Sequence, residues 1–404
     1  MKRTLSTPLS SLIAALALCG CGGGHGSPAA YSLRHTFQIP PGAGQPRGGL
    51  VDDTAGNLYG TASTGGTKRF GAVYRIDAVT GVESVLYSFL GVAQNDAQNP
   101  IGQLVFDSTG DLYGVASNGG SNDVGAVFRI DANSHAESLV HSFAPGPQDG
   151  ALPSRSLLID GQGDLFGTTT QGGANDTGTV YEITPDGRET LLASFGQAAA
   201  GKPAVPRGEL ALDSAGNLYG TTQFGGSSGH GTVWELASSS RGATVLPTVL
   251  HSFAGPPADG TEPVGGVLLD AASGTLYGTT QLGGINDAGT VFRCGVDGSG
   301  ERIVYAFADI SGNDGAAPMA PLVMDSSGVL YGTTDAGGSG YGTVFAVDPA
   351  SGRETVLHRF GGYPAGDGQT PLNARLMIDT AGQLVGVTQL GGANNTGVIY
   401  RLPR

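Results

Sequence analysis

One short motif, Leu-Tyr-Gly or a close variant, returns seven times along the chain at nearly constant spacing. The intervals between successive copies are 54, 53, 53, 58, 54 and 54 residues. The copies begin at Leu58, Leu112, Leu165, Leu218, Leu276, Leu330 and Leu384. A repeat of about fifty residues indicates one supersecondary unit per copy, which buries its apolar faces by stacking on its neighbours. This repeat constrains the fold more than any other feature of the chain.

Each copy contains four segments with the composition of β-strands, as the fourth copy illustrates. A short apolar run at residues 210–213 is followed by strand-like segments at 218–222, 231–236 and 245–253. An Asp-x-x-Gly turn joins the first two segments, and a Gly-Gly loop joins the second and third. The first segments are continuous apolar runs, as expected for strands packed on both faces. We therefore predict an all-β fold, a seven-bladed β-propeller with four-stranded blades.

The two ends of the chain predict how the ring closes. The last copy ends with its third strand at residues 398–402, and no fourth strand follows it. The missing pattern stands at the other end, because residues 31–37 (YSLRHTF) match the fourth strands at 83–89 and 354–360. We expect the N-terminal strand to complete blade seven beside residues 398–402 and thereby remove an open sheet edge.

The composition agrees with short strands joined by turns. The chain of 404 residues contains 71 Gly and 22 Pro, and 13% of its residues are charged. Its formal net charge of −14 argues against nucleic acid as a partner. Beside Cys19 and Cys21 near the N-terminus there is only Cys294, so no disulfide framework is expected. Cys294 follows a strand-like segment and is predicted to be a buried core thiol.

The first residues have the features of an export signal. Lys2 and Arg3 precede an apolar stretch at 9–18 that is too short to span a bilayer. Residues 18–21 resemble the bacterial lipobox and indicate lipidation of Cys21; an ordinary cleaved signal is the alternative. We expect a signal peptide over 1–20, a Gly-rich tether over 21–30 and a single propeller over 31–404. The mature chain, with a charge of about −16, would be anchored by lipid in the bacterial outer membrane, on its periplasmic or cell-surface face.

The repeat can be written LYGTT-x-x-GG-x(4)-GTVF-x(n)-LxSF, and residues 277–292 of the fifth copy show its YGTT, GG and GTVF elements. In this form it resembles the bacterial GloVer repeats, a choice-of-anchor group of secreted proteins. The resemblance covers residues 31–404 and implies a repeat fold and a surface location, without an activity. A weaker likeness to kelch propellers rests on the Gly-Gly pair after the second strand. The later Trp of kelch blades is missing, and Trp234 is the one Trp of this chain.

Two residue types recur at fixed positions in the repeat. His35, His141, His251 and His358 share one position of the fourth strand, where they would lie on different blades, too far apart to share an ion. We predict packing or surface roles for them and no metal. An Asp closes the first strand of every copy, which indicates turn chemistry, with calcium binding by one or two as the alternative. These residues are Asp53, Asp107, Asp160, Asp213, Asp270, Asp325 and Asp379.

Departures from the repeat indicate where a ligand would bind. The start of the innermost strands carries a varied polar set with four arginines: Arg47, Gln103, Arg155, Arg207, Glu209 and Arg375. Guanidinium groups around one channel mouth would form a local anion site in this acidic chain. The loops between second and third strands are turns or a second binding surface, on the face of the blade-to-blade connections. Their candidates are Asn122, Asp123, Asn175, Asp176, Asn286, Asp287, Asn394 and Asn395.

The sequence contains no nucleophile motif, zinc spacing, phosphate loop or nucleotide fingerprint. The first hypothesis is a surface module, without a cofactor, that binds a glycan, a peptide or a protein at the channel mouth. An anionic small molecule or a uronic-acid-containing glycan would suit the arginines. The alternative is a propeller enzyme acting on carbohydrate or another anionic substrate, and a purely architectural role is the third hypothesis. A deep pocket with convergent carboxylates would favour the enzyme, and a flat or plugged mouth the binding module.

Overall fold

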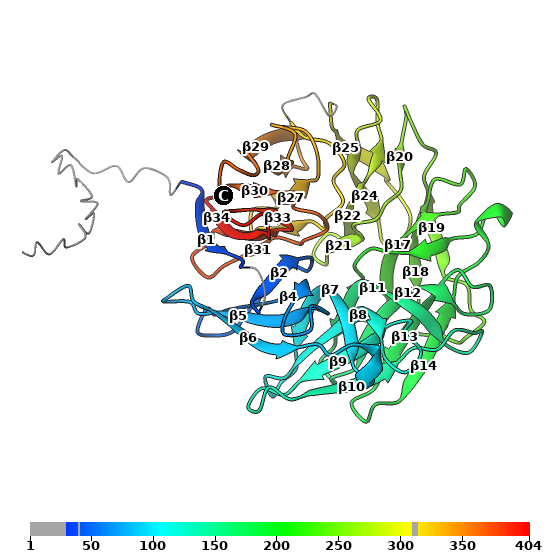
Figure 1. Cartoon of the computed structure of the whole chain (residues 1–404). Coiled ribbons are helices and arrows are strands. Elements are labelled where there is room, and N and C mark those ends of the chain that lie inside the picture. Colours follow the sequence, from blue (N-terminus) through cyan, green and yellow to red (C-terminus); the bar gives the residue numbers. More distant parts are fainter. Residues whose placement is uncertain (1–29, 39–40, 309–313) are drawn as a thin grey trace, which may run out of the picture.

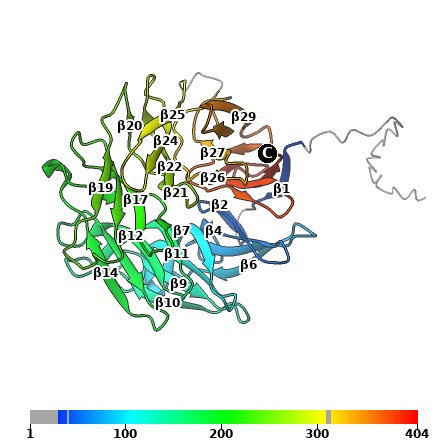
Figure 2. The same ribbon diagram turned by 180° about the vertical axis from the view of Figure 1, so that it is seen from behind.

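The computed structural model describes residues 30–38, 41–308 and 314–404. Seven antiparallel sheets surround a central axis, which confirms the predicted seven-bladed propeller (Figures 1 and 2). Over these ranges the only helical segments are two short 3-10 turns, η1 (Val92–Gln94) and η2 (Ala198–Ala200). No helix among them has the length and apolar character needed to cross a membrane.

The first three blades follow one another along the chain, each from the axis outward. Blade one consists of β2 (Ala43–Pro46), β3 (Val51–Asp52), β4 (Leu58–Gly65), β5 (Ala72–Ile76) and β6 (Glu83–Ser88). Blade two consists of β7 (Ala97–Phe106), β8 (Leu112–Gly119), β9 (Ala126–Ile130) and β10 (Glu137–Ser142). Blade three consists of β11 (Gly150–Ile159), β12 (Leu165–Gly172), β13 (Thr179–Ile183) and β14 (Glu189–Ser194).

The other four blades complete the ring. Blade four consists of β15 (Ala204–Pro206), β16 (Ala211–Leu212), β17 (Leu218–Phe224), β18 (Thr232–Leu236) and β19 (Thr248–Ser252). Blade five consists of β20 (Gly260–Thr261), β21 (Val267–Asp270), β22 (Thr275–Thr280), β23 (Leu282–Gly283), β24 (Thr290–Gly295) and β25 (Arg302–Ala306). Blade six consists of β26 (Val323–Met324), β27 (Leu330–Thr334), β28 (Thr343–Asp348) and β29 (Arg353–Arg359). Blade seven consists of β30 (Gly368–Gln369), β31 (Met377–Ile378), β32 (Leu384–Thr388), β33 (Leu390–Gly391), β34 (Val398–Leu402) and β1 (Ser32–Thr36).

The ring closes as the sequence predicts, with β1 as the outer strand of blade seven beside β34. Ser32 is paired with Arg401 and Thr36 with Val398 in antiparallel register. Just beyond β1, the Phe37 N–H donates to the Gly397 carbonyl oxygen at 3.1 Å. The first and last strands of the propeller therefore share one sheet, and Figure 1 shows them side by side.

The innermost strands begin earlier than the apolar runs of the sequence suggest. Strand β11 already pairs at Gly150 with Gly172, and its register breaks between Pro153 and Leu157. Blade two has a similar break, and in blades one, four, five and seven the innermost strand is divided into two pieces. The apolar runs mark only the second half, because the first half contains Pro and polar residues that read as a loop. The break occurs next to the axis, and there the polar side chains of the site lie.

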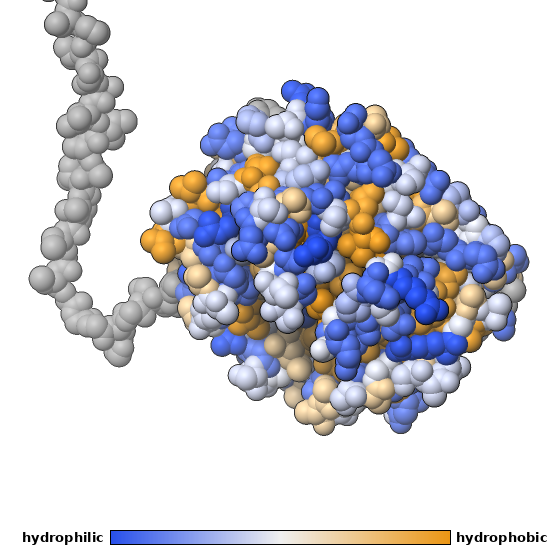
Figure 3. All heavy atoms as spheres, turned by 90° about the horizontal axis from the view of Figure 1, so that it is seen from below, coloured by the Kyte–Doolittle hydropathy of each residue, from blue (hydrophilic) through white to orange (hydrophobic). Residues whose placement is uncertain are grey.

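A ring of seven phenylalanines forms the core between blades. Each follows an outer strand, is fully buried, and packs edge-on against an aromatic ring on the third strand of the next blade. Centroid distances are 4.9–5.4 Å for Phe37–Tyr74, Phe89–Phe128, Phe143–Tyr181, Phe195–Trp234, Phe253–Phe292, Phe307–Phe345 and Phe360–Tyr400. The core is thus spread over the blade seams, while the surface in Figure 3 mixes hydrophilic and hydrophobic residues.

The same aromatic rings explain the glycine of the repeated motif. Gly60 lies opposite Tyr74 in the β4–β5 ladder, and a Cβ added at Gly60 would come within 2.4 Å of the Tyr74 hydroxyl oxygen. Equivalent contacts of 2.2–2.6 Å occur at Gly114, Gly167, Gly220, Gly278, Gly332 and Gly386. The motif keeps a glycine in every blade because the neighbouring aromatic ring occupies the space of a side chain.

The recurrent aspartates are turn residues, as predicted. Asp53 Oδ1 accepts the backbone N–H groups of Ala55 and Asn57, both at 2.9 Å. In each of the other six copies the corresponding carboxylate accepts the N–H group two residues further on. Their recurrence therefore follows from the geometry of the hairpin.

Candidate functional site

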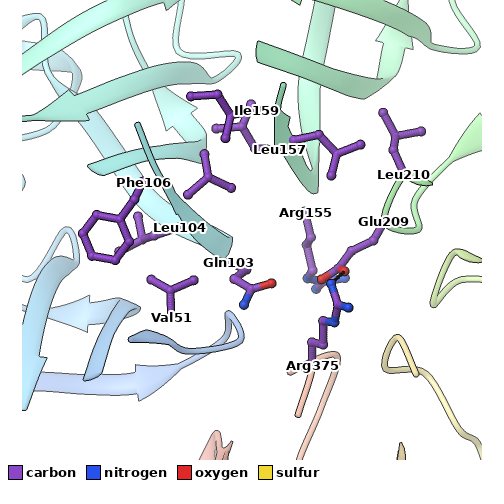
Figure 4. Close-up of a pocket in the computed structure, with 12 residues that line it drawn as sticks. Val51, Gln103, Leu104, Phe106, Arg155, Leu157, Ile159, Glu209, Leu210 and Arg375 are labelled. Carbon is purple, nitrogen blue, oxygen red and sulfur yellow. Dashed lines mark hydrogen bonds and ion pairs between the residues drawn. The ribbon is translucent and has the colours of Figure 1, made fainter. Parts of the chain in front are cut away.

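Four of the predicted mouth residues converge on the ring axis, where we name them the floor: Gln103, Arg155, Glu209 and Arg375 (Figure 4). Gln103 and Arg155 lie at the register breaks of β7 and β11. Glu209 lies between β15 and β16, and Arg375 precedes β31. The interruption of the innermost strands thus places four polar side chains from four blades around one point.

A cavity of about 300 Å³ extends from the floor between apolar walls that include Val51, Phe106 and Leu158. A second hollow of about 490 Å³ shares Gln103 and Arg375 with it and is lined by Met324 and Met377, among others. We call the two hollows together the funnel. Its wall residues come from the last parts of the innermost strands, so the funnel widens toward the Asp-x-x-Gly turns.

On the other side of the floor the channel is nearly filled. Arg207, Val264, Met319 and Asn373 surround a void of only about 10 Å³ there. This is the side of the blade-to-blade connections, where we had expected the binding surface. The large cavity therefore opens at the opposite face of the ring, because side chains and backbone fill the channel on the connection side.

Backbone contacts between neighbouring blades narrow the channel at the floor. A Cβ added at Gly102 would lie 2.2 Å from the Arg155 carbonyl oxygen, and one added at Gly48 would lie 1.8 Å from that of Gly102. Glu209 also forms a parallel bridge with Gly266 of the next blade. Glycines at this level let the innermost strands touch, so the funnel ends at the floor.

The floor has one ion pair and one unpaired guanidinium group. Arg375 Nη1 lies 3.3 Å from Glu209 Oε2, and Gln103 Nε2 donates to the Leu50 carbonyl oxygen at 2.7 Å. Within the described ranges Arg155 forms no ion pair, and its buried Nε has no hydrogen-bond partner. Burial and the charges of Arg47 and Arg207 lower the pKa of Arg155 to about 10. The floor is therefore a positively charged point in an acidic protein.

Glu209 is the floor's only carboxylate. Burial raises the pKa of its side chain, while the charge of Arg375 and the hydrogen bond from it act in the opposite direction. The Glu209 carboxylate thus already has an ion-pair partner within the protein. At the floor it has no second carboxylate beside it of the kind that glycoside hydrolysis requires.

The two remaining arginines of the predicted mouth lie outside the funnel. Arg207 is exposed on the connection side of the floor. The Arg47 guanidinium faces the side-chain amide of Gln389. With the amide oxygen turned toward the arginine, Arg47 Nη2 and Nε each donate to it at 3.0 Å. Both influence Arg155 through their charge. The sequence did not identify the apolar walls as part of a site, because residues such as Phe106 and Met324 end apolar runs that look like ordinary core strands.

The eight loop candidates form hydrogen bonds within their own blades. Asn122 Nδ2 donates to the Phe143 carbonyl oxygen at 3.0 Å, and Asp123 Oδ1 accepts the Gly119 N–H at 2.9 Å. The same two bonds recur for Asn175 and Asp176, Asn286 and Asp287, and Asn394 and Asn395. These bonds account for the recurrence of the residues, and ligand binding by these loops stays a prediction.

The four recurrent histidines lie at four different blade seams, each beside a carboxylate. His35 Nε2 is 2.8 Å from Glu83, and His358 Nε2 is 3.0 Å from Asp367. His141 and His251 lie beside Asp149 and Asp259. Where Tyr replaces His, the hydroxyl donates to the equivalent Asp, as from Tyr87 to Asp96 at 2.8 Å and from Tyr305 to Asp314 at 2.5 Å. The position thus links an outer strand to the connection that follows it, except at His35, whose partner Glu83 lies on β6 of the next blade.

The cysteine predictions separate into two parts. The Cys294 thiol is free and buried, as predicted, and burial, with the charges of Glu301 and Asp297, raises its pKa to about 11. The signal peptide, the tether to residue 29 and Cys21 lie outside the described residues.

Comparison with known proteins identifies a repeat family. The family model described as the Gloeobacter/Verrucomicrobia repeat matches residues 26–214 and 205–404. No curated protein is detectably similar to the chain in sequence.

Solved structures share the propeller fold at low sequence identity. Virginiamycin B lyase from Staphylococcus aureus is 11% identical, with 93% of this chain and 99% of that one covered and a TM-score of 0.57. An oligogalacturonate lyase in complex with manganese is also 11% identical, with 94% of each chain covered and a TM-score of 0.58. The extracellular domain of a putative one-component system from B. thetaiotaomicron is 9% identical, with coverages of 90% and 39% and a TM-score of 0.54. These similarities establish the fold and no activity.

Proposed function

The chain belongs to the Gloeobacter/Verrucomicrobia repeat family, and we propose that its propeller is a binding module whose funnel takes a carboxylate-bearing ligand, such as a uronic-acid-containing glycan. In this proposal the protein is a surface lipoprotein anchored through Cys21, as its N-terminal sequence predicts. The observation that supports the binding site most directly is Arg155, which lines the funnel and forms no ion pair within the described residues; its buried Nε has no hydrogen-bond partner there.

A bound anion would complete the electrostatics of the floor. Arg155 and Arg375 lie together on the axis, and Glu209 can neutralise only one of them. A charge buried without a partner is costly, so a ligand carboxylate that accepts hydrogen bonds from Arg155 gains more here than at the protein surface. The geometry favours one carboxylate at the floor.

The walls suit a ligand that is polar at one end and has apolar faces elsewhere. Val51, Phe106 and Leu158 line the cavity next to the floor, and Met324 and Met377 line the wider part. Sugar rings present C–H faces to such surfaces while their acid groups reach charged residues. A lyase for oligogalacturonate has a similar fold, which supports the idea that this architecture accommodates acidic saccharides.

We favour binding over turnover because the one carboxylate of the floor is committed to an ion pair. Glycoside hydrolysis ordinarily requires two carboxyl groups with different roles. At the floor there is one, Glu209 in its ion pair with Arg375, and Asp52 lies in the wider part of the funnel. The enzyme alternative predicts that an acidic oligosaccharide is shortened when it is incubated with the protein. The binding proposal predicts that the oligosaccharide is recovered intact.

Calorimetric titration of the purified chain with trigalacturonate, and with a neutral trisaccharide as the matched ligand, tests the proposal. We expect the acidic sugar alone to bind, and Arg155→Gln or Arg375→Gln to weaken it about 10- to 100-fold, the value of a charge-assisted hydrogen bond. Arg188→Gln, at an exposed hairpin residue, is the control and should leave the affinity unchanged. Equal binding of the neutral sugar, or no response to either floor substitution, would overturn the proposal.

A further inference from the structure

Two blade seams bring an imidazole and two carboxylates together. At the seam between blades two and three these are His141 of β10, Asp149 before β11 and Glu189 of β14. At the seam between blades four and five they are His251, Asp259 and Glu301. In each cluster one ligand atom from every residue lies within 4.8 Å of the other two.

The spacing at both seams is that of metal ligands. His251 Nε2 lies 3.1 Å from Asp259 Oδ2 and 3.8 Å from Glu301 Oε2, and His141 Nε2 lies 3.3 Å from both Asp149 oxygens. Donor atoms on a tetrahedral zinc ion, each about 2.0 Å from the metal, are about 3.3 Å apart. At the His251 seam the imidazole thus faces oxygens of two different carboxylates, as it would around a shared ion. At the His141 seam both of these oxygens belong to Asp149, and a Glu189 oxygen lies within 4.8 Å of the other ligand atoms.

The other two histidine seams provide an internal comparison. His35 and His358 each lie beside one carboxylate, at 2.8 and 3.0 Å, which are ordinary hydrogen-bond lengths. The connection before blade one has no Asp, and Tyr31 stands in blade seven where five of the other six blades have Glu. Each of these seams therefore lacks one of the three donors.

The carboxylates of the complete clusters are held in place and retain free oxygens. Asp149 accepts the backbone N–H groups of Ala144 and Gly150, at 2.9 and 2.6 Å, and these bonds fix its orientation. Glu189 Oε1 and Glu301 Oε1 are buried and have no hydrogen-bond donor. Glu137 and Glu354 share this feature at the two seams with Tyr in place of His, so the imidazole is what distinguishes the complete clusters. A buried carboxylate oxygen without a donor is rare in proteins, and a bound cation would satisfy it.

We propose that these two clusters are binding sites for divalent first-row metal ions, one at each seam. Each ion would be bound by one imidazole Nε2 and two carboxylates, a donor set suited to Zn²⁺ that leaves one coordination position for water. Its three ligands come from two blades, so the ion would join neighbouring sheets at their outer edges. The chain would bind two ions in total.

The repeat supplies a matched variant for the test. Tyr occupies the histidine position in blades one and five and donates to the equivalent Asp. His141→Tyr and His251→Tyr should therefore keep a hydrogen bond across the seam while removing the nitrogen ligand. Thermal unfolding in the presence of a chelator checks that these variants fold as the wild type does.

The experiment is a calorimetric titration of the untagged, chelator-treated chain with Zn²⁺. We expect two sites per chain, one in each single variant and none in the double variant, whereas His358→Tyr should retain both. Zn²⁺ should raise the melting temperature of the wild type and not that of the double variant. Absence of Zn²⁺ binding with a Kd below about 10 μM, or a stoichiometry that the His141 and His251 substitutions do not change, would overturn the proposal.

Discussion

The closing seam gives the sharpest test of the fold. A chain beginning at residue 38 lacks β1 and Phe37, whereas a chain beginning at residue 30 keeps both and is the matched control. The shorter chain loses the pairing of β1 with β34, the packing of Phe37 on Tyr74, and the Tyr31 ring, which is stacked on His358 at a centroid distance of 3.8 Å.

The size of the loss can be worked out from these contacts. Phe37 is fully buried, and removal of such a ring costs about 3–5 kcal/mol. The backbone bonds of β1, the Phe37 N–H bond to Gly397 and the side-chain bonds from Asn394 and Thr396 to the Phe37 carbonyl oxygen add about 1 kcal/mol each. The total is on the order of 10 kcal/mol, comparable with the whole stability of a typical domain.

Circular dichroism melting and size-exclusion chromatography measure the result. We expect the chain that begins at residue 38 to lose its cooperative transition or to aggregate, because β34 becomes an open edge. Phe37→Ala in the full chain should cost about 3–5 kcal/mol in urea unfolding, as should Phe253→Ala at an internal seam. A truncated chain that melts like the control would refute the closure and the energetic argument together.

Two further predictions concern the seams and the floor. Burial and the charge of Asp96 raise the pKa of Glu137 from 4.5 to about 8, so the folded state holds this proton more tightly than the unfolded state does. Stability from this group is complete below pH 4.5 and is lost as the pH rises to 8. Urea unfolding should therefore find Glu137→Gln more stable than the wild type at pH 9 and similar at pH 4, and a larger gain at pH 4 would contradict the reasoning. Asp186→Asn is the exposed control; hydrogen bonds lower the pKa of this carboxyl, so the substitution should give no gain at pH 9. Gly102→Ala should lower the melting temperature strongly, since the φ of Gly102 is +73° and the added Cβ would lie 2.2 Å from a carbonyl oxygen of the next blade. Gly161→Ala, where the added Cβ would have no atom within 4 Å, should change the melting temperature little. Equal effects of the two substitutions would show that the blades do not need this close contact.

The features that the sequence predicted correctly are local ones, and most of them are repeated in each blade. The Asp turns, the buried Cys294 and the strand order within a blade depend on residues close together in the chain. The start of the innermost strands was placed too late, because β-pairing at Gly150 involves a segment with the composition of a loop. Local composition does not reveal that β-pairing with the neighbouring strand resumes on the other side of an irregular segment.

The site was predictable only in part. Variation among blades pointed to Gln103, Arg155, Glu209 and Arg375, since side chains next to the axis are the ones that can meet. The sequence did not reveal which face the cavity opens on, because that depends on how far backbone and side chains fill each end of the channel. Nor did it reveal the carboxylate partners of His141 and His251, which come partly from the next blade.

The sequence by itself determined the number of blades and the seam at which the ring closes, because the period, the strand pattern and the matching end segments are all local properties. Only the tertiary structure decided where the ring is hollow and which charges meet. Those properties depend on how far apart the seven innermost strands lie around the axis, a distance set by packing between blades. The glycines at the axis and the aromatic rings at the seams set that packing, and within the described ranges they leave the Arg155 Nε beside the funnel without a hydrogen-bond partner.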